Sequence, residues 1–290
     1  MKIIVLSNTG LRLDSTSVYF IKAFKKLLGE DNVEHLQTNE QIMALNGNEA
    51  DHYMKIDDGQ SWTTFNPKLH PSSYYCIDTH IETDWRLKVA SECKIDNMFV
   101  AHKEGLTLPW HTSNVTWVSV GAELESHCVG PKTKLYDVCF LGNFHSQFAS
   151  ARIEYVDALF KHVPNFYFSQ GTRFFKDMAS KLAESRLVFN KSLNGDINMR
   201  FFEAICSGSA LLTDRNVNLA ELGFRDELDY IGYDSIEEMK DKATFYLKHD
   251  DLRERIASDG MQFVHDNHTY EHRAKQILET ISKERVKTNV

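Results

Sequence analysis

Short apolar runs alternate along this chain with segments whose apolar residues recur every three or four positions. In the second half the runs lie at residues 138–141, 187–190 and 210–213, with periodic segments between them. Short apolar runs are typical of strands buried on both faces of a parallel sheet, and the periodic segments are typical of the helices that cover those faces. The alternation therefore predicts an α/β protein of the doubly wound kind.

The same criteria give the other expected elements of both halves. Further strands are predicted at residues 3–6, 74–77, 98–100, 115–120, 166–168 and 230–232, and helices around residues 18–28, 84–93, 153–163, 236–246, 252–263 and 274–281. Residues 37–73 are polar and receive no assignment.

The length of the chain predicts two domains, because 290 residues exceed the usual size of one hydrophobic core. The stretch 121–134 contains Gly130-Pro131 and has no periodicity, so it is the expected linker. We expect an N-terminal domain over residues 1–130 and a C-terminal domain over residues 131–290. The last helix is able to pack on either domain.

Composition restricts the surroundings and the chemistry. The 33 basic and 41 acidic residues give a net charge of -8, which provides no global attraction to DNA or anionic membranes. The first apolar run is too short for a signal peptide or a membrane span, so a cytoplasmic location without a span is expected. Five cysteines without CxxC spacing favour reduced thiols over a disulfide framework or a zinc site. No HExxH or Asp-x-Asp motif occurs, so we expect no catalytic metal.

The segment 187–214 carries the strongest candidate for a ligand site. An apolar run leads into the polar loop 190–198, and a helical segment with Arg200 and Glu203 follows it. The N-terminus of such a helix attracts anions, and the arginine adds a charged contact to a phosphate. A carboxylate one turn into the helix can accept hydrogen bonds from sugar hydroxyls. The alternative is that Asn194-Gly195-Asp196 is only a turn and capping sequence.

Four ordered motifs resemble group 1 glycosyltransferases related to the CgeB spore-maturation protein. They are YDVCFLGN at 136–143, NGDINMRFFEAICSGSALLTD at 194–214, AEL at 220–222 and HTYEHRAKQIL at 268–278. The resemblance covers residues 136–280. It implies a GT-B-like fold of two facing Rossmann-like domains with parallel sheets, in which the second domain binds the donor. It also implies transfer of a hexosyl or pentosyl group from a nucleotide diphosphate sugar, with a UDP-sugar as the expected donor and no further cofactor.

The resemblance also implies roles for individual residues. Glu203 would hold the donor ribose, and Gly142, Asn143 and Arg200 would face the diphosphate. The remaining residues of the expected donor pocket are Asn190, Ser192, Asn194, Asp196 and Asn198. The E-x7-E pattern of many such enzymes is incomplete here, because Gly195 stands eight positions before Glu203; Asp196 is the candidate substitute.

Asp78 and His80 are the candidate catalytic pair. They follow the predicted strand 74–77, and CgeB-like proteins carry a similar acidic and histidine pair. Either side chain can accept a proton from an acceptor hydroxyl. The alternative is that Asp78 caps the next helix and His80 is structural.

The acceptor and the reaction class leave several hypotheses open. The sequence does not identify the acceptor hydroxyl. One candidate is the hydroxyl of a hydroxymethylated base in DNA, since some enzymes with that activity are similar in fold. A sugar-nucleotide epimerase and a non-catalytic protein that binds nucleotide-sugars are the alternatives to a transferase.

Overall fold

The computed structural model describes residues 1–10, 14–57, 65–144, 149–170 and 175–288. The chain forms two compact units, which are described separately. Unit 1 contains Met1–Val120 and Tyr270–Val290, and unit 2 contains Gly121–Thr269. The division lies at the start of the expected linker 121–134 rather than near residue 130. Helix α4 (Leu124–His127) packs on α6 (Phe175–Ala183) and α7 (Met199–Cys206), so it belongs to unit 2.

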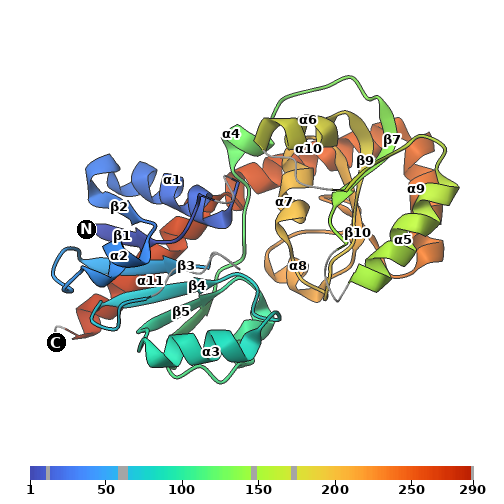
Figure 1. Ribbon diagram of the computed structural model, residues 1–290. Coiled ribbons are helices and arrows are strands. Elements are labelled where there is room, and N and C mark those ends of the chain that lie inside the picture. The colour runs from blue at the N-terminus through green and yellow to red at the C-terminus, as the bar shows by residue number, and fades with distance from the viewer. Residues whose placement is uncertain (11–13, 58–64, 145–148, 171–174, 289–290) are drawn as a thin grey trace. The chain divides into compact units, whose positions relative to one another are not determined.

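Unit 1 is built on a six-stranded parallel sheet (Figure 1). In spatial order the strands are β2 (Val33–Leu36), β1 (Ile3–Leu6), β3 (His52–Ile56), β4 (Ser72–Cys76), β5 (Asn97–Val100) and β6 (Val115–Trp117). The strands predicted at 3–6, 74–77, 98–100 and 115–120 are all present. β2 and β3 were not predicted.

Helices cover both faces of this sheet. On one face Ile4 and Tyr74 join a core with Ile42 of α2 (Asn39–Met43) and Ala90 of α3 (Thr83–Glu92). On the other face Phe20 of α1 (Thr16–Leu28) packs edge-on against Tyr75 of β4, with ring centroids 4.7 Å apart. Successive strand residues point to opposite faces, so the two buried faces explain the unbroken apolar runs.

The last helix, α11 (Tyr270–Thr288), belongs to unit 1, where it packs along α1 (Figure 1). The ring centroid of Tyr270 lies 5.1 Å from those of Tyr19 and Phe20. Arg273 donates from Nε to the carbonyl oxygen of Val120 at 3.2 Å. These contacts fix the C-terminal segment to the first unit.

Unit 2 is built on a five-stranded parallel sheet. In spatial order the strands are β11 (Ile231–Tyr233), β10 (Ala210–Asp214), β9 (Ser185–Asn190), β7 (Tyr136–Gly142) and β8 (Phe166–Gln170). Strand β8 lies on one side of β7 and β9 on the other. The order therefore reverses between β7 and β9, which makes this the topological switch point of the sheet.

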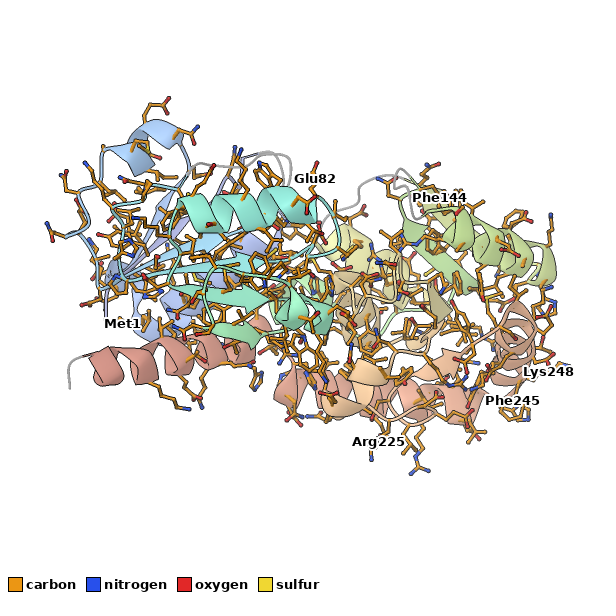
Figure 2. The ribbon with its side chains drawn as sticks, turned by 90° about the horizontal axis from the view of Figure 1, so that it is seen from below. Met1, Glu82, Phe144, Arg225, Phe245 and Lys248 are labelled. Carbon is orange, nitrogen blue, oxygen red and sulfur yellow. A yellow bond between two sulfur atoms is a disulfide. The ribbon has the colours of Figure 1, made fainter. Side chains whose placement is uncertain are left out.

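Aromatic and aliphatic side chains fill the space between this sheet and its helices. The helices of unit 2 besides α4 are α5 (Ala149–His162), α6 (Phe175–Ala183), α7 (Met199–Cys206), α8 (Val217–Glu221), α9 (Ile236–Lys248) and α10 (Asp250–Asn267). Phe140 and Phe189 of the sheet lie in one core with Leu159 of α5 and Met239 of α9. Phe144, labelled in Figure 2, stacks on Phe140 with centroids 5.7 Å apart.

Cys128 and Cys206 form a disulfide with Cα atoms 5.2 Å apart. The expectation of five reduced thiols was therefore wrong for this pair; Cys76, Cys93 and Cys139 are free. The pair is separated by 78 positions and shows no short motif, so only the packing of α4 against α7 reveals it.

Among the described residues, no helix combines the length and the apolarity needed to cross a membrane.

Candidate functional site

The candidate donor residues gather at the carboxyl ends of β7 and β9, at the switch point of unit 2. Gly142 ends β7 and is followed by Asn143, while Asn190 ends β9. In open parallel sheets ligands bind at this position, because the loops there diverge and leave a crevice. The two segments selected from the sequence are thus neighbours in space.

Arg152 of α5 connects these two loops, and sequence reasoning did not select it. Its Nε donates to the carbonyl oxygen of Lys191 at 2.9 Å, and its Nη1 donates to that of Asn143 at 3.3 Å. The residue is only 8% exposed, and burial lowers its pKa. A buried guanidinium at the switch point supplies positive charge beside both loops.

Asn190 is held by hydrogen bonds on several sides. Its Nδ2 donates to Thr213 Oγ1 at 3.0 Å, and its carbonyl oxygen accepts from Tyr233 Oη at 2.8 Å. Asn198 Nδ2 donates to Asn190 Oδ1 at 3.4 Å across the loop. Asn190 therefore ties the start of the loop to β10, β11 and the N-terminus of α7.

Ser192 and its neighbour Lys191 are fixed by Asp214 at the end of β10. The Ser192 amide donates to Asp214 Oδ1 at 2.9 Å, and the Ser192 hydroxyl also donates to this carboxylate. Lys191 Nζ donates to Asp214 Oδ2 at 2.9 Å. Ser192 is buried and acts here as a support for the loop.

Asp196 performs the turn function that was the alternative interpretation of its motif. Its Oδ1 accepts from the amides of Leu193 at 2.8 Å and Asn194 at 3.2 Å. Gly195 adopts a positive φ of 70°, which glycine tolerates without strain. Asn194 is exposed, and Asn216 Nδ2 donates to the carbonyl oxygen of Gly195.

Asn198 begins α7 as its N-cap. Its Oδ1 accepts from the amide of Phe201 at 3.2 Å, as capping residues do. The other amides of the first turn point towards the loop and carry the partial positive charge of the helix end. This end of α7 is where a phosphate would be stabilised.

Arg200 and Glu203 form an ion pair on α7. Arg200 Nη1 lies 2.8 Å from Glu203 Oε2, and Glu203 is only 5% exposed. The second oxygen, Oε1, lies 3.9 Å from Nε2 of the buried His127. The sequence assigned these residues to the diphosphate and the ribose, and the structure places them in one charged group.

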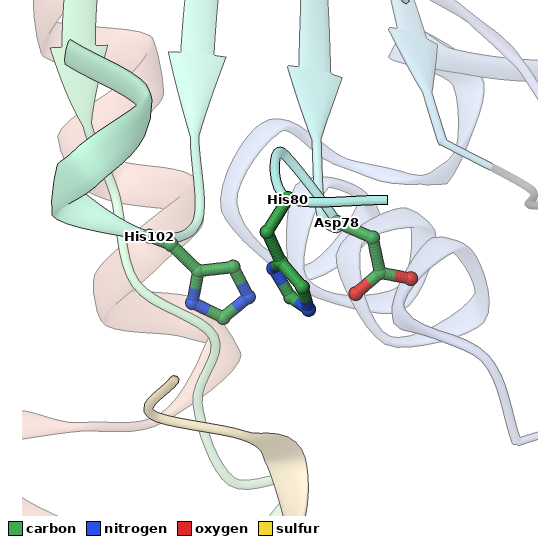
Figure 3. Close-up of side chains that lie close together, drawn as sticks. All are labelled: Asp78, His80 and His102. Atoms are coloured by element: carbon green, nitrogen blue, oxygen red, sulfur yellow. The ribbon is translucent and has the colours of Figure 1, made fainter. Parts of the chain in front are cut away.

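In unit 1 the structure brings His102 to Asp78 and His80. In Figure 3 the His80 ring lies between the His102 ring and the Asp78 carboxylate. The ring centroids of His80 and His102 are 5.2 Å apart. One ligating atom from each of the three side chains lies within 4.8 Å of those of the other two.

Strand register explains this meeting. Cys76 of β4 pairs with Val100 of β5, so Asp78 and His102 lie two positions beyond partnered residues. The strands at 74–77 and 98–100 were predicted from the sequence, but the sequence did not show that they pair with each other. Without that pairing, His102 could not be placed beside Asp78. The N-cap of α3 is Glu82, so Asp78 does not cap that helix.

The charges behind this cluster affect Asp78. Burial raises the pKa of Asp78, and the nearby carboxylate of Asp57 raises it further. Asp57 Oδ2 accepts from Arg86 Nε at 3.1 Å in a buried ion pair at the end of β3. A carboxyl group with a raised pKa is closer to the range in which a general base is effective.

A separate cavity of about 310 Å³ lies at the other edge of unit 2, where β7 and β9 begin. Its lining residues are Lys134, Leu135, Tyr136, Asp137, Asn165, Arg186, Asp250, Arg253 and Glu254. Asp250 pairs with Arg186 at 3.0 Å and with Arg253 at 2.5 Å. Charges already paired in this way indicate a structural role, and parallel sheets bind ligands at the opposite edge.

Residues 143–279 match the model of a protein family described as Glycosyl transferase-like. The matched stretch is similar to this family and includes all the candidate donor residues except Gly142. The two Rossmann-like parallel sheets give the chain a GT-B fold, which solved glycosyltransferases share.

Solved structures show which proteins share this fold. HepE of Anabaena in complex with UDP-glucose is 13% identical, with a TM-score of 0.69 over 98% of this chain and 100% of that one. A glycosyltransferase from Rickettsia africae is 10% identical, with a TM-score of 0.66 over 99% of both chains. An alpha-glucosyltransferase in complex with UDP-glucose and DNA containing an abasic site is 10% identical, with a TM-score of 0.66 over 97% of this chain and 99% of that one. No curated protein matches the chain by sequence.

Proposed function

We propose that this protein transfers a sugar from a nucleotide diphosphate sugar, with a UDP-sugar as the first candidate, to an acceptor hydroxyl. Unit 2 binds the donor, and no metal ion takes part in the chemical step. The relationship to CgeB-like proteins belongs to the same proposal. Structures with the same fold contain UDP-glucose, which supports the choice of donor.

The observation that carries the proposal is the switch point between β7 and β9. Asn143, the loop 190–198 and the capped N-terminus of α7 meet there, within the stretch that is similar to the glycosyl transferase-like family. Developing negative charge on a departing diphosphate is stabilised by helix amides and by a fixed guanidinium. Arg152, which hydrogen-bonds to both loops, and Arg200 in the first turn of α7 are the candidates to supply it.

Asp78 or His80 of unit 1 would accept the proton of the acceptor hydroxyl if the anomeric configuration inverts. The raised pKa of Asp78 favours this role. If the configuration is retained, neither side chain needs to act as a base. The stereochemistry of the product, read by proton NMR, separates these two cases.

The testing experiment incubates the protein with a panel of nucleotide-sugars, with and without acceptors, and measures released nucleotide and glycosylated product. A transferase forms product only with an acceptor present. An epimerase converts the sugar without an acceptor, and a binding protein releases nothing. Either of the last two results would reject the proposal.

A hydroxymethylated base in DNA is the acceptor for which a comparison gives specific support. A protein with the same fold has been solved with UDP-glucose and DNA. The net charge of -8 gives no global attraction to DNA, so a local basic surface would be required. DNA binding that weakens steeply with salt, together with transfer to hydroxymethylated DNA, would establish this acceptor.

A further inference from the structure

Asp78, His80 and His102 offer two imidazoles and one carboxylate at the carboxyl edge of the unit 1 sheet (Figure 3). Asp78 and His80 lie in the loop after β4, and His102 lies in the loop after β5. Adjacent parallel strands hold these loops side by side through bonds such as Ala101 N to Cys76 O at 3.0 Å. The cluster therefore lies in two loops that leave adjacent, hydrogen-bonded strands.

The three ligating atoms lie within 4.8 Å of one another. Atoms about 2.0–2.1 Å from a tetrahedral zinc ion lie about 3.3–3.4 Å from each other. Small rotations of the side chains would close this difference. Asp78 and His80 are partly exposed, whereas His102 is buried, so an ion has a path to the cluster and a fixed ligand within it.

The charges around the cluster favour a cation. Asp57 and Arg86 lie behind Asp78 as a buried ion pair and nearly cancel each other. The carboxylate of Asp78 then leaves the cluster with a net negative charge. Two nitrogen donors with one oxygen donor suit zinc and similar transition ions, whereas magnesium and calcium prefer oxygen donors alone.

We propose that Asp78, His80 and His102 form a binding site for a divalent transition-metal ion such as Zn²⁺, and that the bound ion inhibits sugar transfer. The second half rests on the proposed function, because it takes Asp78 or His80 as the base. An ion at the cluster occupies the lone pairs that would accept the proton of the acceptor. The ion is thus a reversible inhibitor of a reaction that itself needs no metal.

Binding is tested on the whole metal-free protein, without any sugar substrate. Zn²⁺ is titrated by calorimetry, and Co²⁺ is added as a spectroscopic probe of the ligands. We expect one site per chain, visible-range Co²⁺ bands of nitrogen and oxygen ligands, and no thiolate-to-cobalt charge transfer. His80→Ala and His102→Ala should each weaken Zn²⁺ binding by about 100-fold. Residues that only hydrogen-bond to a metal ligand typically cost about 10-fold to 100-fold in metal affinity when they are replaced, so loss of a direct ligand should reach at least the upper value.

Three controls keep this test decisive. His265→Ala removes an exposed histidine that also lies beside a carboxylate, Asp266, and it should bind Zn²⁺ like the unchanged protein. Because His102 is buried, circular dichroism checks that His102→Ala folds; His80→Ala carries the test if it does not. Mg²⁺ should show no binding at the concentrations used for Zn²⁺.

The outcomes separate this site from the proposed function. Failure of Zn²⁺ to bind, or equal binding by His80→Ala, would overturn the site whatever the enzyme does. If Zn²⁺ binds, we expect it to inhibit sugar transfer over the same range of Zn²⁺ concentration in which it binds. Binding without inhibition in an active enzyme would overturn the regulatory half, and absence of transfer in metal-free protein would instead count against the proposed function.

Discussion

Arg200 Nη1 and Glu203 Oε2 lie 2.8 Å apart on α7, so the two charged residues predicted to contact the diphosphate and the ribose form an ion pair with each other. Glu203 is only 5% exposed and also lies near His127. A buried carboxylate with a paired arginine is costly to disturb, because removing one partner leaves the other charge without compensation. The ion pair and His127 therefore hold the Glu203 carboxylate in a fixed orientation.

Glu203→Ala should weaken UDP binding by about 10-fold to 100-fold, since hydrogen bonds to a charged group contribute about 1.5–3 kcal/mol. Calorimetry with UDP measures the change. Glu237→Ala, in the exposed first turn of α9, is the matched control and should bind UDP normally. Unchanged affinity in a folded Glu203→Ala protein would remove the ribose assignment.

Arg152→Met should destabilise unit 2 by about 3 kcal/mol, because two hydrogen bonds from a charged donor to the carbonyl oxygens of Asn143 and Lys191 are lost. UDP binding should weaken as well, since both loops at the switch point become less ordered. Urea unfolding and UDP titration check the two effects. Lys161→Met, an exposed change on the same helix, should alter neither property.

The Cys128–Cys206 disulfide predicts three reactive thiols in denaturant without reductant, and five after reduction. Thiol titration measures both numbers. Removing the bond in Cys128→Ser with Cys206→Ala should cost about 4 kcal/mol, because a bond across so long a loop restricts the unfolded chain strongly. Cys93→Ala is the control, and five thiols before reduction would contradict the pairing.

Gly260→Ala should destabilise the protein, although alanine usually stabilises the interior of a helix by about 1 kcal/mol. A Cβ at position 260 would lie 2.2 Å from the carbonyl oxygen of Asp229, which is backbone and cannot move aside easily. Thermal unfolding of the Gly260→Ala protein shows whether this substitution in α10 raises or lowers the stability. Ser258→Ala on the exposed side of α10 should be neutral or stabilising, and a stabilised Gly260→Ala would show that the close approach is wrong.

The free energy of unfolding should depend on pH because Lys134 has a lowered pKa. The residue as a whole is exposed, but its Nζ donates to Ala183 O and Ser209 Oγ at 2.9 Å, and partial desolvation of this ammonium group lowers the pKa of Lys134 from 10.5 to about 8. Below pH 8 the lysine is charged in both the folded and the unfolded state, and the cost of desolvating its ammonium group is fully present. Between pH 8 and 10.5 only the unfolded chain keeps the proton, so stability rises with pH.

Lys134→Met removes this titration. The stability of the unchanged protein relative to the variant should therefore increase from about pH 7 to about pH 10. Urea unfolding of both proteins in matched buffers measures the difference and cancels the titration of all other groups. A constant or decreasing difference would contradict the lowered pKa.

The sequence alone determined the elements whose apolar pattern is local and continuous. The strands at β1, β4, β5 and β7 to β11, and most helices between them, follow from runs and periodicities that neighbouring residues share. It also placed Asn190, Asn198 and Gly142 at ends of elements, and so at the edge where parallel sheets bind ligands. β3 was missed because His52 and Lys55 interrupt its apolar residues, although both are buried in the sheet.

Only the tertiary structure decided which distant residues meet. His102 joins Asp78 because β4 and β5 pair in one register, and Arg152 reaches two loops because the strand order reverses between β7 and β9. Cys128 and Cys206 meet because α4 packs on α7. Such contacts cannot be predicted from the local propensity of each segment, since strand pairing and helix packing depend on the whole buried surface of each unit.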